Sequence, residues 1–427
     1  MARSLALAIS VLLVIPAIAE AARVPTVRVG FAKPVETASM VGFVHGMDLR
    51  RPADEMIDPL APALWRGKLR DVPYDRVQEL GGRYTYVLSD RWGYPGAGHR
   101  APYEDFRAWE RFVRRTARSS RRGSVVWDIW NEPNERWFWQ GTPEQLYETY
   151  RIAENVLRQE LGPDVLVGGP STLGWSSDWI TGLLEWCLAR GCQVNVLSWH
   201  ELTSGSIPGI RDRLEYAREA LLESRRYRAL EIRELHVNEA GTAADQYRPG
   251  ELLGVMHYLE AGGADAAART CWDDFSGGSN CYNDTLAGLL VPRTFEPRAA
   301  WWATKAYADG VGSRVLTRFD DPHVVGLGSS RSDVPRTAQL LIAHLRGHGA
   351  KELDVRVTLR RLGTLGFLRG ERRVRVRIER YPDSGEQPLP APRGRRPALV
   401  PIEDGQATLT LHNVRIHEAY RLRLSEP

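Results

Sequence analysis

Two glutamates stand where β-rich segments of the sequence end. Glu132 closes the β-rich run at residues 125–131, and Glu239 closes the one at residues 234–238. Pro133 cannot donate to a sheet ladder, so the first segment must stop beside Glu132. Hydrolysis of a glycosidic bond needs two carboxyl groups across the anomeric carbon. One protonates the leaving oxygen, and the other acts as nucleophile or activates water.

The elements that would position these acids alternate along the chain. Strand-like runs occur at residues 41–45, 64–67, 83–90, 125–132, 164–170, 194–200, 234–241 and 267–274, with helical patterns between them. Eight strands alternating with helices predict an α/β fold, a (β/α)8 TIM barrel, in which strands four and seven lie across the lumen. A doubly wound sheet is the competing architecture, but the first strand is followed by no glycine-rich phosphate turn.

The chain is long enough for two domains. Its 427 residues exceed one ordinary core. From residue 312 the rhythm changes to short alternating runs, which predict a C-terminal antiparallel β-sandwich domain over residues 312–427, with a long loop at 382–397. The barrel then spans residues 41–311. Residues 22–40 form an N-terminal arm that we expect to pair with the sandwich, because an isolated strand needs a partner.

The first 21 residues have the form of a secretory signal peptide. Arg3 precedes an apolar run, and small residues follow at Ala17, Ala19 and Ala21. The run is short for a membrane span and contains Pro16. We therefore predict a secreted or periplasmic protein with no stable membrane insertion after signal removal; an uncleaved anchor is the alternative.

The four cysteines form two local pairs, Cys187 with Cys192 and Cys271 with Cys281. In an exported protein an even count favours disulfides, and reduced buried thiols are the alternative. Neither spacing matches a zinc site, and the acidic pair at residues 273–274 has no third ligand nearby. The sequence therefore predicts no metal and no cofactor.

Charge and tryptophan are both unevenly distributed. The net charge is only +4, which gives no reason to expect a nucleic-acid partner, yet residues 313–427 hold 21 Lys+Arg against 13 Asp+Glu. A basic surface explains this, and an acidic polymer as partner is the weaker alternative. All 14 tryptophans lie between Trp65 and Trp302. The predicted sandwich therefore lacks the rings of a stacking-type sugar-binding module, and we expect it to support the barrel.

The run Trp-Asn-Glu-Pro-Asn at residues 130–134 resembles the acid/base motif of clan A glycoside hydrolases. Together with Trp-Phe-Trp at 137–139 and Val-Gly-Gly-Pro-Ser at 167–171, it is most similar to glycoside hydrolase family 39. That family includes β-xylosidases, α-L-iduronidases and exopolysaccharide-linked glycosidases, and joins a (β/α)8 barrel to a β-sandwich. The resemblance implies Glu132 as general acid/base and Glu239 as nucleophile.

It also implies roles for three further residues. Asn131 would bind the sugar 2-hydroxyl, His200 would orient a catalytic carboxylate, and Trp272 would form the platform under the reacting sugar. From their strand-end positions, His45, Asp90 and Trp92 are further candidate sugar contacts. All six residues are candidate substrate contacts, with packing as the alternative for His45 and His200.

Two departures from the family pattern concern the substrate. Glu239 lies in Asn-Glu-Ala-Gly, where the family usually has Thr-Glu followed by an aromatic residue. The loops after strands two and three are short, which suggests an open groove for a polymer. The resulting prediction is a secreted retaining glycosidase with an oligo- or polysaccharide as partner. The alternative is a catalytically inactive carbohydrate-binding barrel, which would need neither acid.

Overall fold

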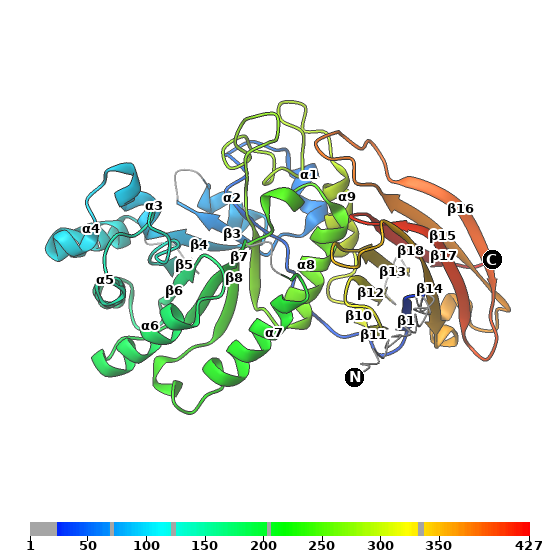
Figure 1. The fold of residues 1–427 in the computed structure, drawn as a ribbon, viewed down its shortest axis with the longest axis horizontal. Helices are drawn as coiled ribbons and strands as arrows, with labels where there is room; N and C mark the ends of the chain where they lie inside the picture. The colour runs from blue at the N-terminus through cyan, green and yellow to red at the C-terminus, as the bar shows by residue number, and fades with distance from the viewer. Residues whose placement is uncertain (1–23, 69–71, 121–124, 203–205, 332–336) are drawn as a thin grey trace, which may run out of the picture.

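The computed structural model describes residues 24–68, 72–120, 125–202, 206–331 and 337–427. The described chain forms a closed barrel beside a β-sandwich (Figure 1). The predicted signal segment, residues 1–21, lies outside the described residues. Within the described ranges, no helix is both long and apolar enough to cross a membrane.

The barrel strands are parallel and close in chain order, which confirms the predicted fold class. Phe43 on the first of them pairs with Arg269 on the last. The strands are β2 (Gly42–Val44), β3 (Leu64–Gly67), β4 (Arg83–Val87), β5 (Val125–Asp128), β6 (Leu166–Thr172), β7 (Val196–Glu201), β8 (Glu234–Ala240) and β9 (Ala266–Arg269). Their carboxyl ends share one rim, where chemistry sits in this architecture.

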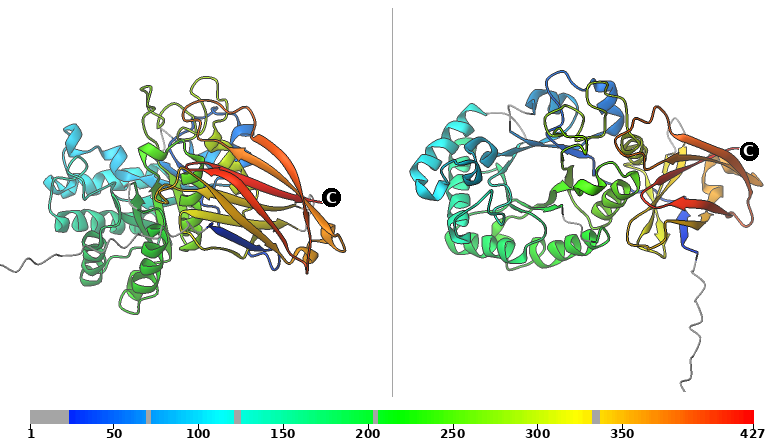
Figure 2. Two further views of the ribbon diagram at one scale, coloured as in Figure 1. Left: turned by 45° about the vertical axis from the view of Figure 1, so that its right-hand side comes forward. Right: turned by 45° about the horizontal axis from the view of Figure 1, so that its top comes forward.

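Helices ring the barrel, as the right-hand view of Figure 2 shows. They are α1 (Asp54–Ile57), α2 (Tyr74–Glu79), α3 (Leu88–Trp92), α4 (Phe106–Ser119), α5 (Pro143–Leu161), α6 (Ser177–Arg190), α7 (Gly209–Tyr216), α8 (Pro249–Ala261) and α9 (Ala299–Ala308). Helix α5 begins at a capping box: the Gln145 N–H donates to Thr142 Oγ1, and the Thr142 N–H donates to Gln145 Oε1. This cap fixes the end of the loop that joins β5 to α5 and carries Glu132.

The sandwich consists of a four-stranded sheet in the order β11-β1-β14-β17 and a six-stranded sheet in the order β10-β12-β13-β18-β15-β16. The strands are β1 (Thr26–Gly30), β10 (Arg314–Val315), β11 (Thr317–Phe319), β12 (Val324–Arg331), β13 (Thr337–His344), β14 (Glu352–Arg360), β15 (Arg373–Tyr381), β16 (Arg393–Pro401), β17 (Ala407–Arg415) and β18 (Ala419–Ser425). An apolar core that includes Val27, Val357 and Leu422 fills the space between them. Strand β1 from the N-terminal arm pairs with both β11 and β14.

Helices α8 and α9 lie between the barrel strands and the six-stranded sheet (Figure 1). Helix α8 and the six-stranded sheet approach closely at Gly254. A Cβ added there would lie 2.6 Å from a Leu345 methyl carbon. A Cβ at Gly250 would lie 2.7 Å from the carbonyl carbon of His417. The two domains therefore meet through glycines that let backbone and side chains touch, and the contact is a packed interface.

The sequence-based boundaries were wrong at four places that matter. The third barrel strand was predicted to reach residue 90 but ends at Val87, where helix α3 begins at once. The fourth was predicted to reach Glu132 but ends at Asp128. The last barrel strand was predicted to reach residue 274 but ends at Arg269. The chain beyond it turns back on itself: the Asp274 N–H donates to the Gly278 carbonyl, and the Asn280 N–H donates to the Trp272 carbonyl. The predicted loop at 382–397 gives way to strand β16, whose residues pair with β15 from Arg393 onward.

Candidate active site

Glu132 lies just beyond β5 in a conformation that non-glycine residues rarely adopt. Its φ is +43°, and its side chain is buried. The surrounding structure holds this turn: the Glu132 N–H donates to the Ser171 carbonyl at 2.9 Å. Residues kept in sparsely populated backbone conformations cost free energy and cluster at functional sites. The turn presents the Glu132 carboxyl at the barrel rim.

His200, at the carboxyl end of β7, contacts Glu132 directly. Its Nδ1 lies 2.8 Å from Glu132 Oε1. Burial lowers the pKa of His200 to about 3, so the ring is neutral at pH 7. Its Nε2 is buried and has no hydrogen-bond partner among the described residues. A neutral ring has one N–H, and placing it on Nδ1 lets it donate to Oε1 of Glu132.

The pKa of Glu132 is far from its ordinary value. Burial raises it from 4.5 to about 7, although the Arg66 cation pulls it in the opposite direction. A carboxyl with a pKa near neutrality can both give and take a proton at pH 7. This is the electrostatic property that a general acid/base requires.

Arg66 on β3 connects the two halves of the site. Its Nη1 donates to Glu239 Oε1 at 2.5 Å, its Nη2 donates to Asn131 Oδ1 at 2.7 Å, and both Nε and Nη2 donate to Asp128. Burial alone would lower the pKa of Arg66, but the charges of Asp128 and Glu239 raise it above its ordinary value. The guanidinium is therefore a fixed cation at the barrel rim.

Arg66 was not among the residues that the sequence singled out. It lies inside a short segment, Leu-Trp-Arg-Gly, that resembled a weak strand. All four residues of that strand are buried, and Arg66 is only 2% exposed. An arginine inside an otherwise apolar buried strand was the available signal, because a buried cation needs a carboxylate partner.

Glu239 on β8 has both carboxylate oxygens occupied. Arg66 donates to Oε1, and Thr270 Oγ1 donates to Oε2 at 2.8 Å. These two donors fix the orientation of the carboxylate. One carboxylate oxygen of Glu239, one of Glu132 and a ring nitrogen of His200 all lie within 4.8 Å of one another. The two acids predicted to face each other are therefore neighbours in space.

The same three residues could in principle offer ligands to a metal ion. The Arg66 guanidinium is already in contact with Glu239, and a second cation there would be repelled by it. Glu132 is likewise engaged by His200. The donor set is arranged around an organic cation, which does not favour a metal centre.

A polar layer beneath the rim surrounds Arg66 and Asn131. Asn238 Nδ2 and Ser171 Oγ both donate to Asp128, at 2.9 and 2.8 Å. The Asn131 N–H donates to Ser89 Oγ at 3.0 Å. Since Arg66 occupies the amide oxygen of Asn131, its amide nitrogen remains as the donor for a ligand. Asp128 is therefore a buried anchor.

A cleft of about 450 Å³ opens over Arg66, Asn131 and Glu239. His45 and Asp90 line it, as do two exposed aromatic residues. Trp137 is 51% exposed, and Tyr282 is 66% exposed. Trp137 comes from the loop after β5, and Tyr282 from the loop after β9. The volume suits a ligand of a few hundred cubic ångströms, and exposed aromatic faces can pack against sugar rings.

Two predicted contacts lie elsewhere. The ring of Trp92 packs against Trp109 and Phe112, with centroids 5.3 and 5.1 Å apart. Its Nε1 donates to the Arg100 carbonyl, and Trp92 is not among the residues that line the cleft. It packs there because α3 directs it onto α4.

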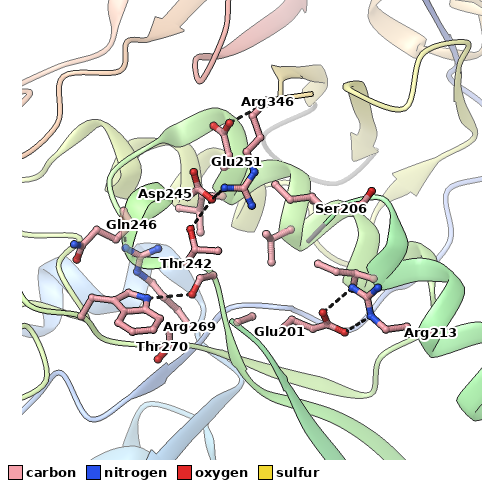
Figure 3. Close-up of a pocket in the computed structure, with 17 residues that line it drawn as sticks. Glu201, Ser206, Arg213, Thr242, Asp245, Gln246, Glu251, Arg269, Thr270 and Arg346 are labelled. Atoms are coloured by element: carbon pink, nitrogen blue, oxygen red, sulfur yellow. Dashed lines mark hydrogen bonds and ion pairs between the residues drawn. The ribbon is translucent and has the colours of Figure 1, made fainter. Parts of the chain in front are cut away.

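Trp272 lines a second, smaller cavity of about 30 Å³. Its Nε1 donates to the Gly241 carbonyl at 3.0 Å, which fixes the ring over the end of β8. Figure 3 shows the charged walls of this cavity, where Glu201 pairs with Arg213, and where Arg346 of the sandwich approaches Asp245 and Glu251. The ring was predicted as a sugar platform from a strand end that the structure places three residues earlier, at Arg269.

Both predicted disulfides are formed, which confirms the pairing. Cys187 is joined to Cys192, and Cys271 to Cys281. Cys271 and Cys281 line the cleft, next to Tyr282. The second bridge therefore ties the loop that carries Tyr282 to the end of the barrel strand.

Comparison with known proteins gives matches to glycosidases. Residues 98–231, which include Glu132 and His200, match the model of "Glycosyl hydrolases family 39". A β-xylosidase from Geobacillus stearothermophilus is 35% identical over 80 residues, which cover 18% of this chain and 16% of that protein. A 3-O-α-D-galactosyl-α-L-arabinofuranosidase from Bifidobacterium longum subsp. longum is 25% identical over 178 residues, 41% of this chain and 14% of that protein.

The fold has matches over nearly the whole chain. The structure of N2152 from Neocallimastix frontalis superposes with a TM-score of 0.75 and 18% identity, covering 95% of this chain and 100% of that one. By contrast, the chain aligns with less than a fifth of the length of the two curated relatives. The structural match concerns the fold, and the family model covers the segment that carries Glu132 and His200.

Proposed function

We propose that this chain, which belongs to glycosyl hydrolases family 39, hydrolyses O-glycosidic bonds of an oligo- or polysaccharide with retention of configuration. The observation that carries the proposal is the short separation of two unlike carboxyls. Oxygens of Glu132 and Glu239 lie within 4.8 Å of each other. Retaining enzymes hold their pair about 5–5.5 Å apart, whereas inverting enzymes need about 6.5–9.5 Å to admit a water.

In the first step Glu239 attacks the anomeric carbon while Glu132 protonates the leaving oxygen. The C–O bond breaks, and the glycosyl group becomes an ester of Glu239. His200 supports this role of Glu132, because its Nδ1–H occupies Oε1 and leaves the acidic proton to Oε2. Arg66 and Thr270 hold the carboxylate of Glu239 in one orientation, so less conformational entropy is lost when it reaches the attacking geometry.

In the second step Glu132, now ionised, takes a proton from water, and the oxygen of that water displaces Glu239 from the anomeric carbon. Two inversions at one carbon retain its configuration. The amide nitrogen of Asn131, left free by Arg66, donates to the sugar 2-hydroxyl as charge develops on the ring. Hydrogen bonds to this hydroxyl strengthen in the transition state of glycosidases.

The cleft supports a polymeric substrate. Trp137 and Tyr282 come from different loops and are both exposed at the cleft wall, so sugar units could pack on more than one ring. The two disulfides support the accompanying proposal that the protein acts outside the cytoplasm, secreted or periplasmic, where such bonds persist.

The test is chemical rescue of Glu239→Gly. An aryl glycoside is first found by a screen that begins with pentosides, since the two matched relatives are a xylosidase and an arabinofuranosidase. Without the nucleophile, turnover should fall by several orders of magnitude. Added azide should restore part of it, by attacking the anomeric carbon and giving a glycosyl azide of inverted configuration.

The matched control is Glu135→Gly, which removes a half-buried acid three residues from Glu132. It should keep its activity and form no glycosyl azide. Full activity in Glu239→Gly would end the nucleophile assignment. Wild-type protein that binds sugars but hydrolyses no glycoside in the screen would favour the carbohydrate-binding alternative.

A further inference from the structure

A groove of about 830 Å³ crosses the outer face of the four-stranded sandwich sheet. It lies over β1, β11 and β14, which Figure 1 shows side by side in the part of the molecule away from the barrel. We call it the basic groove and define it by its charged lining residues: Arg28, Lys33, Arg318, Arg360, Arg361 and Asp404. None of these residues belongs to the barrel or to the candidate active site.

The charges of the basic groove are almost all of one sign. Five cations stand against one acid, whereas an ordinary charged surface mixes the two signs. Arg28 has a long ion pair, 4.0 Å from Asp320. Within the described parts of the chain, the ion pairs include none to Lys33, Arg318, Arg360 or Arg361. The groove is thus a concentration of positive charge in which Arg28 is the cation with an ion pair among the described residues.

Strand register makes this arrangement costly. Arg28 on β1 and Arg318 on β11 are direct partners across an antiparallel pair. Like charges directly opposite each other on neighbouring strands are destabilising. Arg360 lies on the other neighbour of β1, opposite Gly30. Asp320 offsets part of this repulsion from 4.0 Å away, and an anion bound between the strands would offset more of it.

Gly30 keeps the floor of the groove open. A Cβ added at this position would meet only the Leu316 carbonyl oxygen, at 3.9 Å. Among the described residues, no side chain lies within 4 Å of that Cβ position. A flexible anionic chain can therefore approach the backbone between Arg318 and Arg360.

We propose that the basic groove binds an acidic polysaccharide, a chain of uronate-type sugars, at a site separate from the cleft. The cations are spread over three strands and two flanking loops, which suits repeated carboxylates better than one small anion. The described residues that line the groove include no aromatic side chain, whereas channels for single-stranded nucleic acids add stacking rings to their cations. The choice of a polysaccharide among polyanions rests on the proposed function. The expectation that the groove binds an anion does not depend on that function.

The test measures binding, so it does not depend on turnover. The probe is polygalacturonate, and its fully methyl-esterified form supplies the same chain without charge. The full-length protein should bind the acidic form at low salt. Binding should weaken steeply as salt is raised through about 0.1 M, where the screening length falls to about 10 Å. The esterified form should not bind.

Two variants locate the site. Arg318→Glu combined with Arg360→Glu should weaken binding about tenfold, since each exposed charge contact changes affinity by a factor of about two to five. The carboxylate introduced at position 318 lies opposite Arg28, so folding is not endangered. Gly30→Leu should reduce binding similarly while all charges remain, because it fills the floor.

The matched control is Arg373→Glu combined with Arg377→Glu on β15. These arginines are exposed on the other sheet, and the change in net charge is identical. The control should bind like wild type. Equal losses in both double variants, unchanged binding in Gly30→Leu, or tighter binding of a single-stranded oligonucleotide than of polygalacturonate would each overturn the proposal. Hydrolysis of glycosides by the groove variants remains a separate readout, so a failed groove leaves the cleft proposal intact.

Discussion

The alkaline limb of the pH–rate profile should belong to Glu132. The proposed acid must carry its proton to act on the leaving oxygen, and burial raises its pKa to about 7. We therefore expect kcat/KM for a substrate with a poor leaving group to fall about tenfold per pH unit above pH 7. In Glu132→Ala this limb should vanish.

The size of the effect follows from the pKa. A carboxyl at its ordinary value of 4.5 would be protonated in roughly one molecule of 300 at pH 7, whereas a pKa of about 7 protonates about half of them. Burial thus raises the population of the working acid roughly 150-fold at neutral pH. That is equivalent to about 3 kcal/mol of differential interaction between the two protonation states.

The assay compares two aryl glycosides of the same sugar over pH 4 to 9. One has a poor leaving group that needs the proton, and the other is a 2,4-dinitrophenyl glycoside that does not. Glu132→Ala should lose most activity on the first and keep much of it on the second. Glu135→Ala, the matched control, should behave like wild type on both.

Two results would refute this reasoning. A wild-type limb centred near pH 4.5 would mean that burial does not raise the pKa in the folded protein. A limb at pH 7 that persists unchanged in Glu132→Ala would assign it to another group. Equal losses on both substrates would also argue against a proton donor.

Two further predictions concern stability. Because the pKa of Glu132 is raised on folding, stability is present below about pH 4.5 and is lost as the pH rises to about 7. Glu132→Gln should therefore be more stable than wild type at pH 8, by up to about 3 kcal/mol, and not at pH 4; equal urea midpoints at pH 8 would contradict this. Arg66→Met leaves Asp128 and Glu239 without their cation and should cost about 3–5 kcal/mol. Arg83→Met, which breaks a partly exposed pair with Glu234, should cost about 1 kcal/mol or less in the same urea unfolding assay.

Local sequence patterns were sufficient for the barrel. Strand period, helix period and strand ends are set by neighbouring residues, so the alternation of elements and the two strand-end glutamates could be predicted. Errors arose where the chain departs from local preference. Beyond Arg269 the residues Cys271 and Trp272 still favour a strand, but loop hydrogen bonds to Gly278 and from Asn280 replace the ladder. Strand β16 is rich in arginine and proline, and only its partner β15 makes it a strand.

The sequence predicted the two acids of the candidate site but not its cation, Arg66. Arg66 joins residues 62, 65 and 173 positions away, and no local pattern reports such contacts. Long-range contacts also explain a tryptophan that was predicted as a sugar contact but does not line the cleft. Trp92 lies at a strand end like a sugar contact, yet its packing partners Trp109 and Phe112 on α4 decide its orientation. Residue type and position proposed the chemistry, and long-range contacts selected which residues reach it.

Strand β1 makes the barrel an insertion within the sandwich. Its partner β14 lies some 300 residues later, with the whole barrel between them. On a ribosome, the first strand of the sandwich emerges before any of its neighbours exist and must wait until the barrel is made. A fragment that begins at residue 312 would lack β1, which lies between β11 and β14 in the sheet. The edges of β11 and β14 that pair with β1 would then be exposed, and exposed strand edges promote aggregation. The two domains are separate in space, but the sandwich can be completed only after the whole chain has been made. The pairing of β1 with β11 and β14 is therefore the long-range step that we expect to come last.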